Sequence, residues 1–162
     1  MTRFFNDVVV GEAEELGSHT FTADEIKTFA RAFDPQPFHL DEAAGAASHF
    51  GGLCASGWHT ASMWMRLRVD SLKRQAEDAR AQGRPVPKLG PSPGFRDLRW
   101  LRPVKPGDTL VFWSKIVDKR VSASRPGWGL LTHQNWADNQ KGERAFEFTG
   151  TNFLEVSPGA AG

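Results

Sequence analysis

Residues 56–69 read SGWHTASMWMRLRV, and we interpret this stretch as the centre of the fold. Ser56 suits the N-cap of a helix, because its hydroxyl can accept a hydrogen bond from a backbone N–H of the first turn. Apolar side chains occupy nearly every side of the turns that follow, which predicts a helix buried on most sides. Polar residues from Lys73 onward predict a solvated second half, so we expect a helix from Gly57 to about Arg80.

A second helix is predicted upstream, from about Ala23 to Phe33. Thr22 and Glu25 form a capping box, in which each side chain accepts from the backbone N–H of the other residue, and apolar residues follow at helical spacing. Before it, Val8–Val10 and residues 13–21 have the composition of irregular edge strands. The first part of the chain is therefore expected to hold edge strands followed by one capped helix.

Between the two helices, residues 34–41 read DPQPFHLD. Each proline restricts the residue before it to extended backbone, so we expect a stiff, extended connector over residues 34–38. Asp41 suits the N-cap of a short helix over residues 42–48, and Gly51-Gly52 ends that helix.

Downstream of the long helix the hydrophobic period changes to two. Residues 82–94 carry four of the ten prolines and predict a mobile loop without regular structure. Turn sequences then separate four predicted strands, whose short connections favour antiparallel pairing, at residues 95–101, 109–119, 128–137 and 144–156. Helices followed by strands indicate an α+β fold, an antiparallel sheet wrapped around a long central helix. We expect residues 1–156 to form one domain and residues 157–162 a flexible tail.

The composition excludes several classes of protein. With 162 residues, 40% of them hydrophobic and 24% charged, the chain has the size and balance of a globular domain. A net charge of +1 without a block of Lys or Arg gives no sign of nucleic-acid binding. No stretch has the apolar length of a signal peptide or a transmembrane helix, so we expect no membrane contact. One cysteine cannot form an internal disulfide, which favours a cytoplasmic setting.

Asp34 and His39 are the strongest candidates for catalysis. On a connector stiffened by prolines, a carboxylate and an imidazole can face one point and share one water, as a general acid/base pair requires. As residue types alone they also fit a helix terminus and a structural histidine, and short motifs of this kind often match by chance.

The start of the long helix supplies a second candidate, Gly57. Backbone N–H groups of the first turn have no partner within the helix and lie at its positive end, so they can hold a carbonyl or oxyanion oxygen. A glycine at this position is equally consistent with close packing.

Other residues are weaker candidates. Cys54 lacks a third residue to orient it as a nucleophile and fits a small buried apolar residue better. The histidines at positions 39, 49 and 59 match no metal-ligand spacing, and we expect no metal site. His19 and His133 fall in strand-like segments and are interpreted as structural. Residues that suit either phosphate binding or a solvated sheet edge are Arg96, Arg99, Arg102, Lys105, Arg120 and Arg125.

The order and identity of these residues resemble a known family. DPQPFHLD at 34–41, GGLCASGWHT at 51–60 and PGFRDLRWLRPVKPGDTL at 93–110 resemble the hydratase signature of MaoC-like dehydratases, relatives of the (R)-specific enoyl-CoA hydratases. Gln36 departs from the pattern, because better-known members carry Asn there. The resemblance covers nearly the whole chain and implies a hotdog fold. Because hotdogs of this family usually pair, it also implies a homodimer or higher homo-oligomer.

The resemblance further implies a function. The chain is expected to be a lyase that adds water reversibly to the double bond of an enoyl thioester, carried by CoA or by acyl carrier protein, without a cofactor. Asp34 and His39 would activate the water, and the Gly57 amide would hold the thioester carbonyl. Phe38, Ser56 and Trp58 are expected to line the substrate site.

Two alternatives stay open at this point. A hotdog acyl-CoA thioesterase would place a carboxylate on or near the central helix, where the first half of the helix offers only Asp70. A non-catalytic module that binds acyl thioesters would need no acid/base pair, so the presence of both Asp34 and His39 argues against it.

Overall fold

Five antiparallel strands form one sheet in the order β1-β3-β4-β5-β2. The structure is a computed structural model and describes residues 3–157. The strands are β1 (Ala13–Thr20), β2 (Gly94–Trp100), β3 (Thr109–Val121), β4 (Trp128–Asn139) and β5 (Arg144–Glu155). Strands β3, β4 and β5 pair consecutively, while β1 and β2 pair at the two edges. The four strands predicted after the long helix, and their antiparallel pairing, are confirmed.

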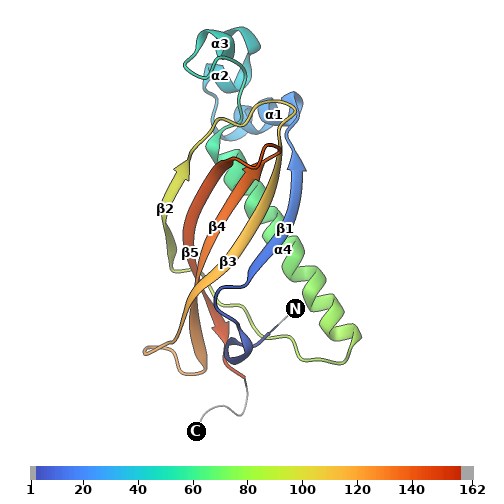
Figure 1. Ribbon diagram of the computed structural model, residues 1–162, viewed down its shortest axis with the longest axis vertical. Helices are drawn as coiled ribbons and strands as arrows, with labels where there is room; N and C mark the ends of the chain where they lie inside the picture. Colours follow the sequence, from blue (N-terminus) through green and yellow to red (C-terminus); the bar gives the residue numbers. More distant parts are fainter. Residues whose placement is uncertain (1–2, 158–162) are drawn as a thin grey trace.

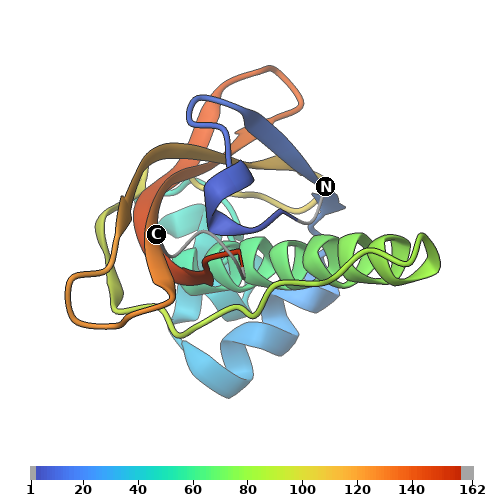
Figure 2. The same ribbon diagram turned by 90° about the horizontal axis from the view of Figure 1, so that it is seen from below.

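Four α-helices accompany the sheet in the described part of the chain: α1 (Ala23–Phe33), α2 (Pro37–Leu40), α3 (Glu42–Ala47) and α4 (Gly57–Ala81). Figure 1 shows α4 running behind the sheet, with α1, α2 and α3 gathered at the end where α4 begins. Seen from below, the sheet curves over α4, and α1 lies on the other side of that helix (Figure 2). An antiparallel sheet around one long helix is the hotdog arrangement, so the predicted α+β fold is confirmed.

Helix α4 begins and ends close to its predicted bounds. Ser56 caps it, because Oγ of Ser56 accepts a hydrogen bond from the backbone N–H of Trp58 at 3.2 Å. On the face toward the sheet, Trp64 is 7% exposed and packs in the main core with Phe112 and Phe146. Burial of this face holds the helix in the concave side of the sheet.

The prediction that α4 is buried on most sides is wrong for the chain taken alone. Trp58, Met65 and Val69 are 51%, 54% and 38% exposed. Spaced by seven and then four residues, these side chains lie along one face of the helix. The helix therefore carries an apolar stripe, Trp58–Met65–Val69, on the side that the sheet does not cover.

Helix α1 has the predicted bounds and the predicted cap. Oγ1 of Thr22 accepts from the backbone N–H of Glu25 at 3.2 Å, and Oε2 of Glu25 accepts from the backbone N–H of Thr22 at 3.0 Å. Its C-cap residue is Asp34. The position of the Asp34 backbone is therefore set by the C-terminus of α1.

The connector after α1 is shorter than predicted. Residues 34–36 are non-helical, but Pro37 is the first residue of α2, so the expected extended backbone over residues 34–38 is wrong for its last two positions. Proline suits the first position of a helix, because its φ is already helical and its missing N–H would have no partner there. Asp41 ends α2 and caps α3 as predicted, accepting from the backbone N–H of Ala44 at 2.8 Å.

Two further expectations are revised. Val8–Val10 do not form a strand; a single 3₁₀ turn (η1, Phe5–Asp7) precedes them, and Val8 packs with Phe5 and Leu131 in a small second core, which fixes this segment by tertiary contact. Residues 82–93 have no helix or strand, as predicted, but Gly94, the last residue of the predicted loop, already begins β2. The second half of the loop is nevertheless anchored along β5, where the N–H of Gly90 donates to the carbonyl of Phe153 at 2.9 Å. Most of the predicted tail, residues 158–162, lies outside the described residues.

Candidate active site

A cavity of about 620 Å³ opens where α2, the start of α4 and the segment after β2 meet. Its lining includes all six residues chosen from the sequence, which are Asp34, Phe38, His39, Ser56, Gly57 and Trp58. The volume lies within the usual range of small-molecule sites. The short helix α2 and the first turn of α4 thus bring residues that are about twenty positions apart to one cavity.

The carboxylate of Asp34 and the imidazole of His39 face each other. Oδ2 of Asp34 lies 3.4 Å from Nε2 of His39. His39 lies in α2, where its side chain is 7% exposed, and that of Asp34 is 19% exposed. The predicted pairing of these two groups is therefore present in the fold, inside the cavity.

The backbone of Cys54 orients the His39 ring. Nδ1 of His39 lies 2.7 Å from the carbonyl oxygen of Cys54, which can only accept. A neutral ring therefore carries its proton on Nδ1 and directs the lone pair of Nε2 toward Asp34. Two acceptors this close to each other can share one water molecule and take its proton, as a general acid/base pair requires.

Asp34 is held in its charged form. Burial opposes that charge, but hydrogen bonds from Ser56 and Gln36, together with the positive charge of His39 when its ring is protonated, outweigh burial and leave the Asp34 pKa below its usual value. Oγ of Ser56 donates to Oδ2 at 2.7 Å, and Nε2 of Gln36 donates to Oδ1 at 2.8 Å. Gln36, the residue that departs from the family pattern, thus braces the carboxylate directly.

Ser56 links the carboxylate to α4. Its hydroxyl donates to Asp34 and accepts from the backbone N–H of Trp58, so both roles of the oxygen are filled. Ser56, which we expected to line the substrate site, lies at the cavity, where its hydroxyl positions Asp34 and caps the helix.

Gly57 lies directly against Trp100. A Cβ atom added at Gly57 would lie 2.5 Å from Nε1 and 2.6 Å from Cδ2 of the Trp100 ring, far inside contact distance. Close packing, one of the two explanations offered for this glycine, is therefore present. Gly57 is also half-exposed at the cavity, at the positive end of α4.

Aromatic rings form much of the remaining wall. Phe38 packs edge-on against His39 with a centroid distance of 4.5 Å and also contacts Phe50. Trp58 packs edge-on against Trp100 at 5.3 Å. The residues not foreseen from the sequence, Phe50 and Trp100, come from α3–α4 and β2, and no local pattern marks them as neighbours of Asp34.

The weaker candidates take other positions. Cys54 is buried, and burial raises the pKa of its thiol, which disfavours a nucleophilic thiolate. The ring of His59 stacks on Phe29 rather than facing His39, and burial lowers the His59 pKa to about 4. Within residues 3–157 no three His, Cys, Asp or Glu side chains gather as metal ligands.

Three of the six basic residues, Arg96, Arg99 and Arg102, form ion pairs on the edge strand β2 or just after it. Arg102 lines the cavity and forms an ion pair of 3.3 Å with Glu143. Arg99 lies 3.8 Å from Glu147, and Nζ of Lys105 donates to the carbonyl of Gly51. Of the basic set, Arg102 is thus the member that borders the cavity in the described chain.

The fold and the cavity define a hotdog protein with a carboxylate–imidazole pair beside the start of its central helix. A family model described as "MaoC like domain" matches residues 7–127, so the chain belongs to this family, which includes hydratases and dehydratases.

Known proteins resemble the chain over nearly its full length. A MaoC-like dehydratase from Rhodospirillum rubrum has a crystal structure with a TM-score of 0.80 and 36% identity, covering 96% of this chain and 99% of that one. The uncharacterized protein YdeM of Bacillus subtilis (strain 168) is 26% identical over 142 residues, 88% of this chain and 92% of that protein. The unliganded (R)-hydratase PhaJ1 from Pseudomonas aeruginosa has the same fold, with a TM-score of 0.64, 22% identity and coverages of 95% and 86%.

None of the helices between residues 3 and 157 combines the length and the apolar character needed to cross a membrane.

Proposed function

We propose that this protein is a lyase that adds water reversibly to the double bond of an enoyl thioester, with CoA or acyl carrier protein as the thiol component. The observation that carries the proposal is the 3.4 Å separation of Asp34 Oδ2 and His39 Nε2 in a cavity that also borders the first turn of α4. Membership of the MaoC-like family supports this class of reaction.

In the hydration direction, a water held by Asp34 and His39 gives up a proton to this pair. Its oxygen forms a bond to the β-carbon of the enoyl group, and the electrons of the double bond move toward the thioester carbonyl. The pair then returns a proton to the α-carbon, which completes the 3-hydroxyacyl thioester. Dehydration is the same sequence reversed.

The negative charge that develops on the thioester oxygen needs a partner. We assign this role to the backbone N–H of Gly57, because the first N–H groups of a helix lie at its positive end. Phe38 and Trp58 would contact the acyl and pantetheine parts of the substrate, and Ser56 would hold Asp34 in place.

We further propose that the chain works as a homodimer or a higher homo-oligomer. The apolar stripe Trp58–Met65–Val69 on α4 is uncovered in one chain, and it starts at the cavity. A second copy that covers this stripe would enclose the open side of the candidate site and exclude water from the bound thioester.

The thioesterase alternative has less support. Asp70, the carboxylate it would need, lies 2.7 Å from Arg66 in an ion pair within α4 and does not line the cavity. A cytoplasmic location is proposed with the lyase function, because the one cysteine, Cys54, is a free thiol.

The deciding experiment is a screen of enoyl and 3-hydroxyacyl thioesters, on CoA and on acyl carrier protein, for loss or formation of the conjugated double bond. Asp34→Asn should abolish turnover, whereas the matched change Asp70→Asn, which removes a carboxylate from α4 outside the cavity, should not. Release of free thiol that depends on Asp70, with no change in the double bond, would replace this proposal with the thioesterase.

A further inference from the structure

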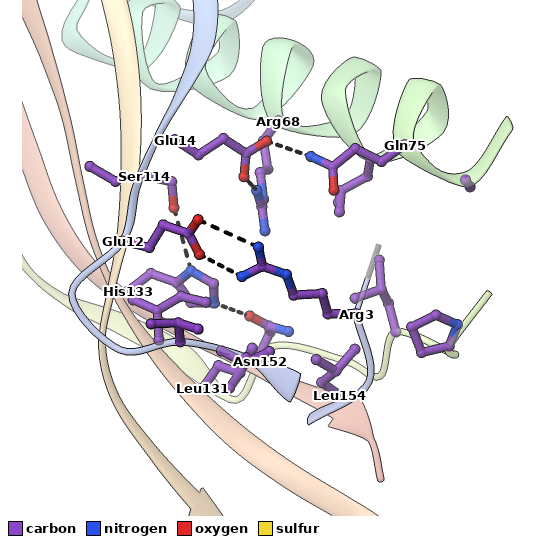
Figure 3. Close-up of a pocket in the computed structure, with 18 of the residues that line it drawn as sticks. Arg3, Glu12, Glu14, Arg68, Gln75, Ser114, Leu131, His133, Asn152 and Leu154 are labelled. Atoms are coloured by element: carbon purple, nitrogen blue, oxygen red, sulfur yellow. Dashed lines mark hydrogen bonds and ion pairs between the residues drawn. The ribbon is translucent and has the colours of Figure 1, made fainter. Parts of the chain in front are cut away.

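A second cavity, of about 300 Å³, lies between the second half of α4 and the inner face of the sheet (Figure 3). It shares no lining residue with the candidate active site. Along β3, Phe112 belongs to the main core, whereas Ser114 and Ile116, further along the strand, line the cavity. The core thus separates the two cavities, and the hydration chemistry uses none of the side chains described below.

The side of the cavity toward α4 presents a fixed guanidinium. Nη1 of Arg68 donates to Oε2 of Glu14 at 2.8 Å, and Oε1 of Glu14 accepts from Ser71 at 2.5 Å and from Gln75 at 2.6 Å. Glu14 is therefore satisfied by three partners from one helix. Figure 3 shows Arg68 reaching from α4 into the space above the sheet.

Arg68 keeps donors to spare. Its side chain is 17% exposed, and within residues 3–157 the bond to Glu14 is the single hydrogen bond found for its guanidinium. An arginine has five N–H donors, and those of Arg68 that do not bind Glu14 remain accessible, since none of them is a buried atom without a partner. These donors can therefore bind an acceptor that enters the cavity.

The side toward the sheet is polar, and its side chains contact one another. Nε2 of His133 contacts Oδ1 of Asn152, and Nδ1 of His133 lies 3.4 Å from Oγ of Ser114. The Ser114 hydroxyl in turn donates to Asn135 at 2.8 Å. Burial, then the charge of Arg68, lowers the His133 pKa to about 4, so the ring is neutral at pH 7. His133, interpreted from the sequence as structural, lies at this cavity.

The rest of the cavity wall is largely apolar. Its remaining charged residues, Arg3 and Glu12, have opposite charges. An ion pair of 2.5 Å joins Arg3 to Glu12 there. With Arg68 opposed by Glu14, the four charged residues cancel, so no net charge repels an anion. The apolar wall includes Val8, Leu72, Val86, Ile116, Leu131 and Leu154.

We propose that this cavity binds a small aliphatic carboxylate. The ligand carboxylate accepts hydrogen bonds from the free N–H groups of Arg68, because a planar guanidinium can bind Glu14 on one edge and a second carboxylate on another. The hydrocarbon chain of the ligand contacts the apolar wall. The volume is at the lower end of small-molecule sites, which suits a short-chain acid and is too small for a CoA-sized ligand.

Calorimetry with butanoate, hexanoate and octanoate tests the proposal, with hexan-1-ol as the probe that keeps the chain and loses the charge. At least one of the acids should bind, and hexan-1-ol at least about tenfold more weakly than hexanoate, because a hydrogen bond to a charged group is lost. Absence of binding by all three acids, or equal binding of the acid and the alcohol, would overturn the proposal.

Variants place the ligand in this cavity. Arg68→Gln should weaken hexanoate binding at least about tenfold, whereas Arg66→Gln, on the exposed side of the same helix, should not. Ala76→Leu fills the cavity without changing any charge and should abolish binding. If Arg68→Gln does not fold, Ala76→Leu and the acid-to-alcohol comparison decide. Unchanged binding in Ala76→Leu would move the acid to another site and contradict the proposal.

Discussion

Oδ2 of Asp34 lies 3.4 Å from Nε2 of His39 and 2.7 Å from Oγ of Ser56, the N-cap of α4. One carboxylate oxygen therefore contacts both the proposed base and the residue that starts the central helix. The acid/base pair and the helix N-terminus form one hydrogen-bonded unit, although they are distant in sequence.

Replacement of His39 by Gln should remove the base and keep the fold. The Gln amide can still donate to the Cys54 carbonyl, so the buried acceptor keeps a partner. We expect kcat for hydration to fall by about 10²–10⁴ with little change in the thermal unfolding midpoint. Near-normal turnover in this variant would remove His39 from the proposed mechanism.

Ser56→Ala should change the pH profile as well as the rate. The Ser56 hydrogen bond helps to keep the Asp34 pKa low, so its loss should raise that pKa and move the acidic limb of kcat/KM to higher pH. Loss of the N-cap should also lower the free energy of unfolding by about 1 kcal/mol. Ser62→Ala, on the exposed face of the same helix, is the control, and an unshifted acidic limb in Ser56→Ala would contradict the positioning role.

Gly57→Ala should destabilise the protein by about 1–3 kcal/mol, because the new methyl group overlaps the Trp100 ring. Adding Trp100→Ala should relieve the overlap and restore the thermal unfolding midpoint. If the thioester carbonyl must also come close to the backbone N–H of residue 57, the added methyl group should hinder that approach. Turnover should then stay lower in the double variant than in Trp100→Ala alone. Equal turnover in the double variant and in Trp100→Ala would mean that position 57 requires glycine only for its packing against Trp100.

Stability should fall when the pH is lowered from about 6.5 to about 4. His59 and His133 have folded-state pKa values of about 4, whereas the unfolded chain takes up these protons near the ordinary histidine value of 6.5. The unfolded state therefore binds more protons in this window, and the free energy of unfolding decreases as pH falls.

Urea unfolding at pH 7 and at pH 5 measures this effect. His59→Leu should make the loss between the two pH values smaller, because one of the two buried imidazoles is gone. The exposed His49→Gln should leave the loss unchanged. The explanation fails if His59→Leu loses as much stability as the parent protein over the same interval.

Met65→Lys should weaken self-association. Met65 lies in the middle of the apolar stripe on α4 and is more than half exposed in one chain, so a lysine there costs the lone chain little but places a charge in the proposed interface. Light scattering coupled to size exclusion should show a lower mass for this variant, with Ala81→Lys at the exposed end of α4 as the control. Equal masses for the two variants would locate the interface elsewhere.

Local chemistry in the sequence predicted much of the fold. The capping box at Thr22 and Glu25 set the start of α1, Ser56 set the start of α4, and alternating patterns located the four later strands. Each of these signals acts over a few residues, which is the range that a pattern in one sequence can report.

The errors came from contacts between distant residues. Apolarity around α4 predicted burial, but only the packed sheet decides which side is covered, and Met65 is left outside. The bond between Ser56 and Asp34 spans 22 positions, and the contact of Trp100 with Gly57 joins β2 to α4. The second cavity is lined by side chains from α4, from four strands, from the segment before β1 and from the loop after α4, so no local sequence motif could predict it.

The acceptor that orients His39 is a main-chain oxygen, that of Cys54, and this has a consequence for mutational tolerance. A side-chain acceptor can be lost by a single codon change, but every residue type at position 54 supplies the same carbonyl. Exchange of Cys54 for another small residue should therefore leave the tautomer of His39 intact. The orientation and tautomer of His39 should therefore tolerate substitutions at position 54, the residue that supplies the hydrogen-bond acceptor.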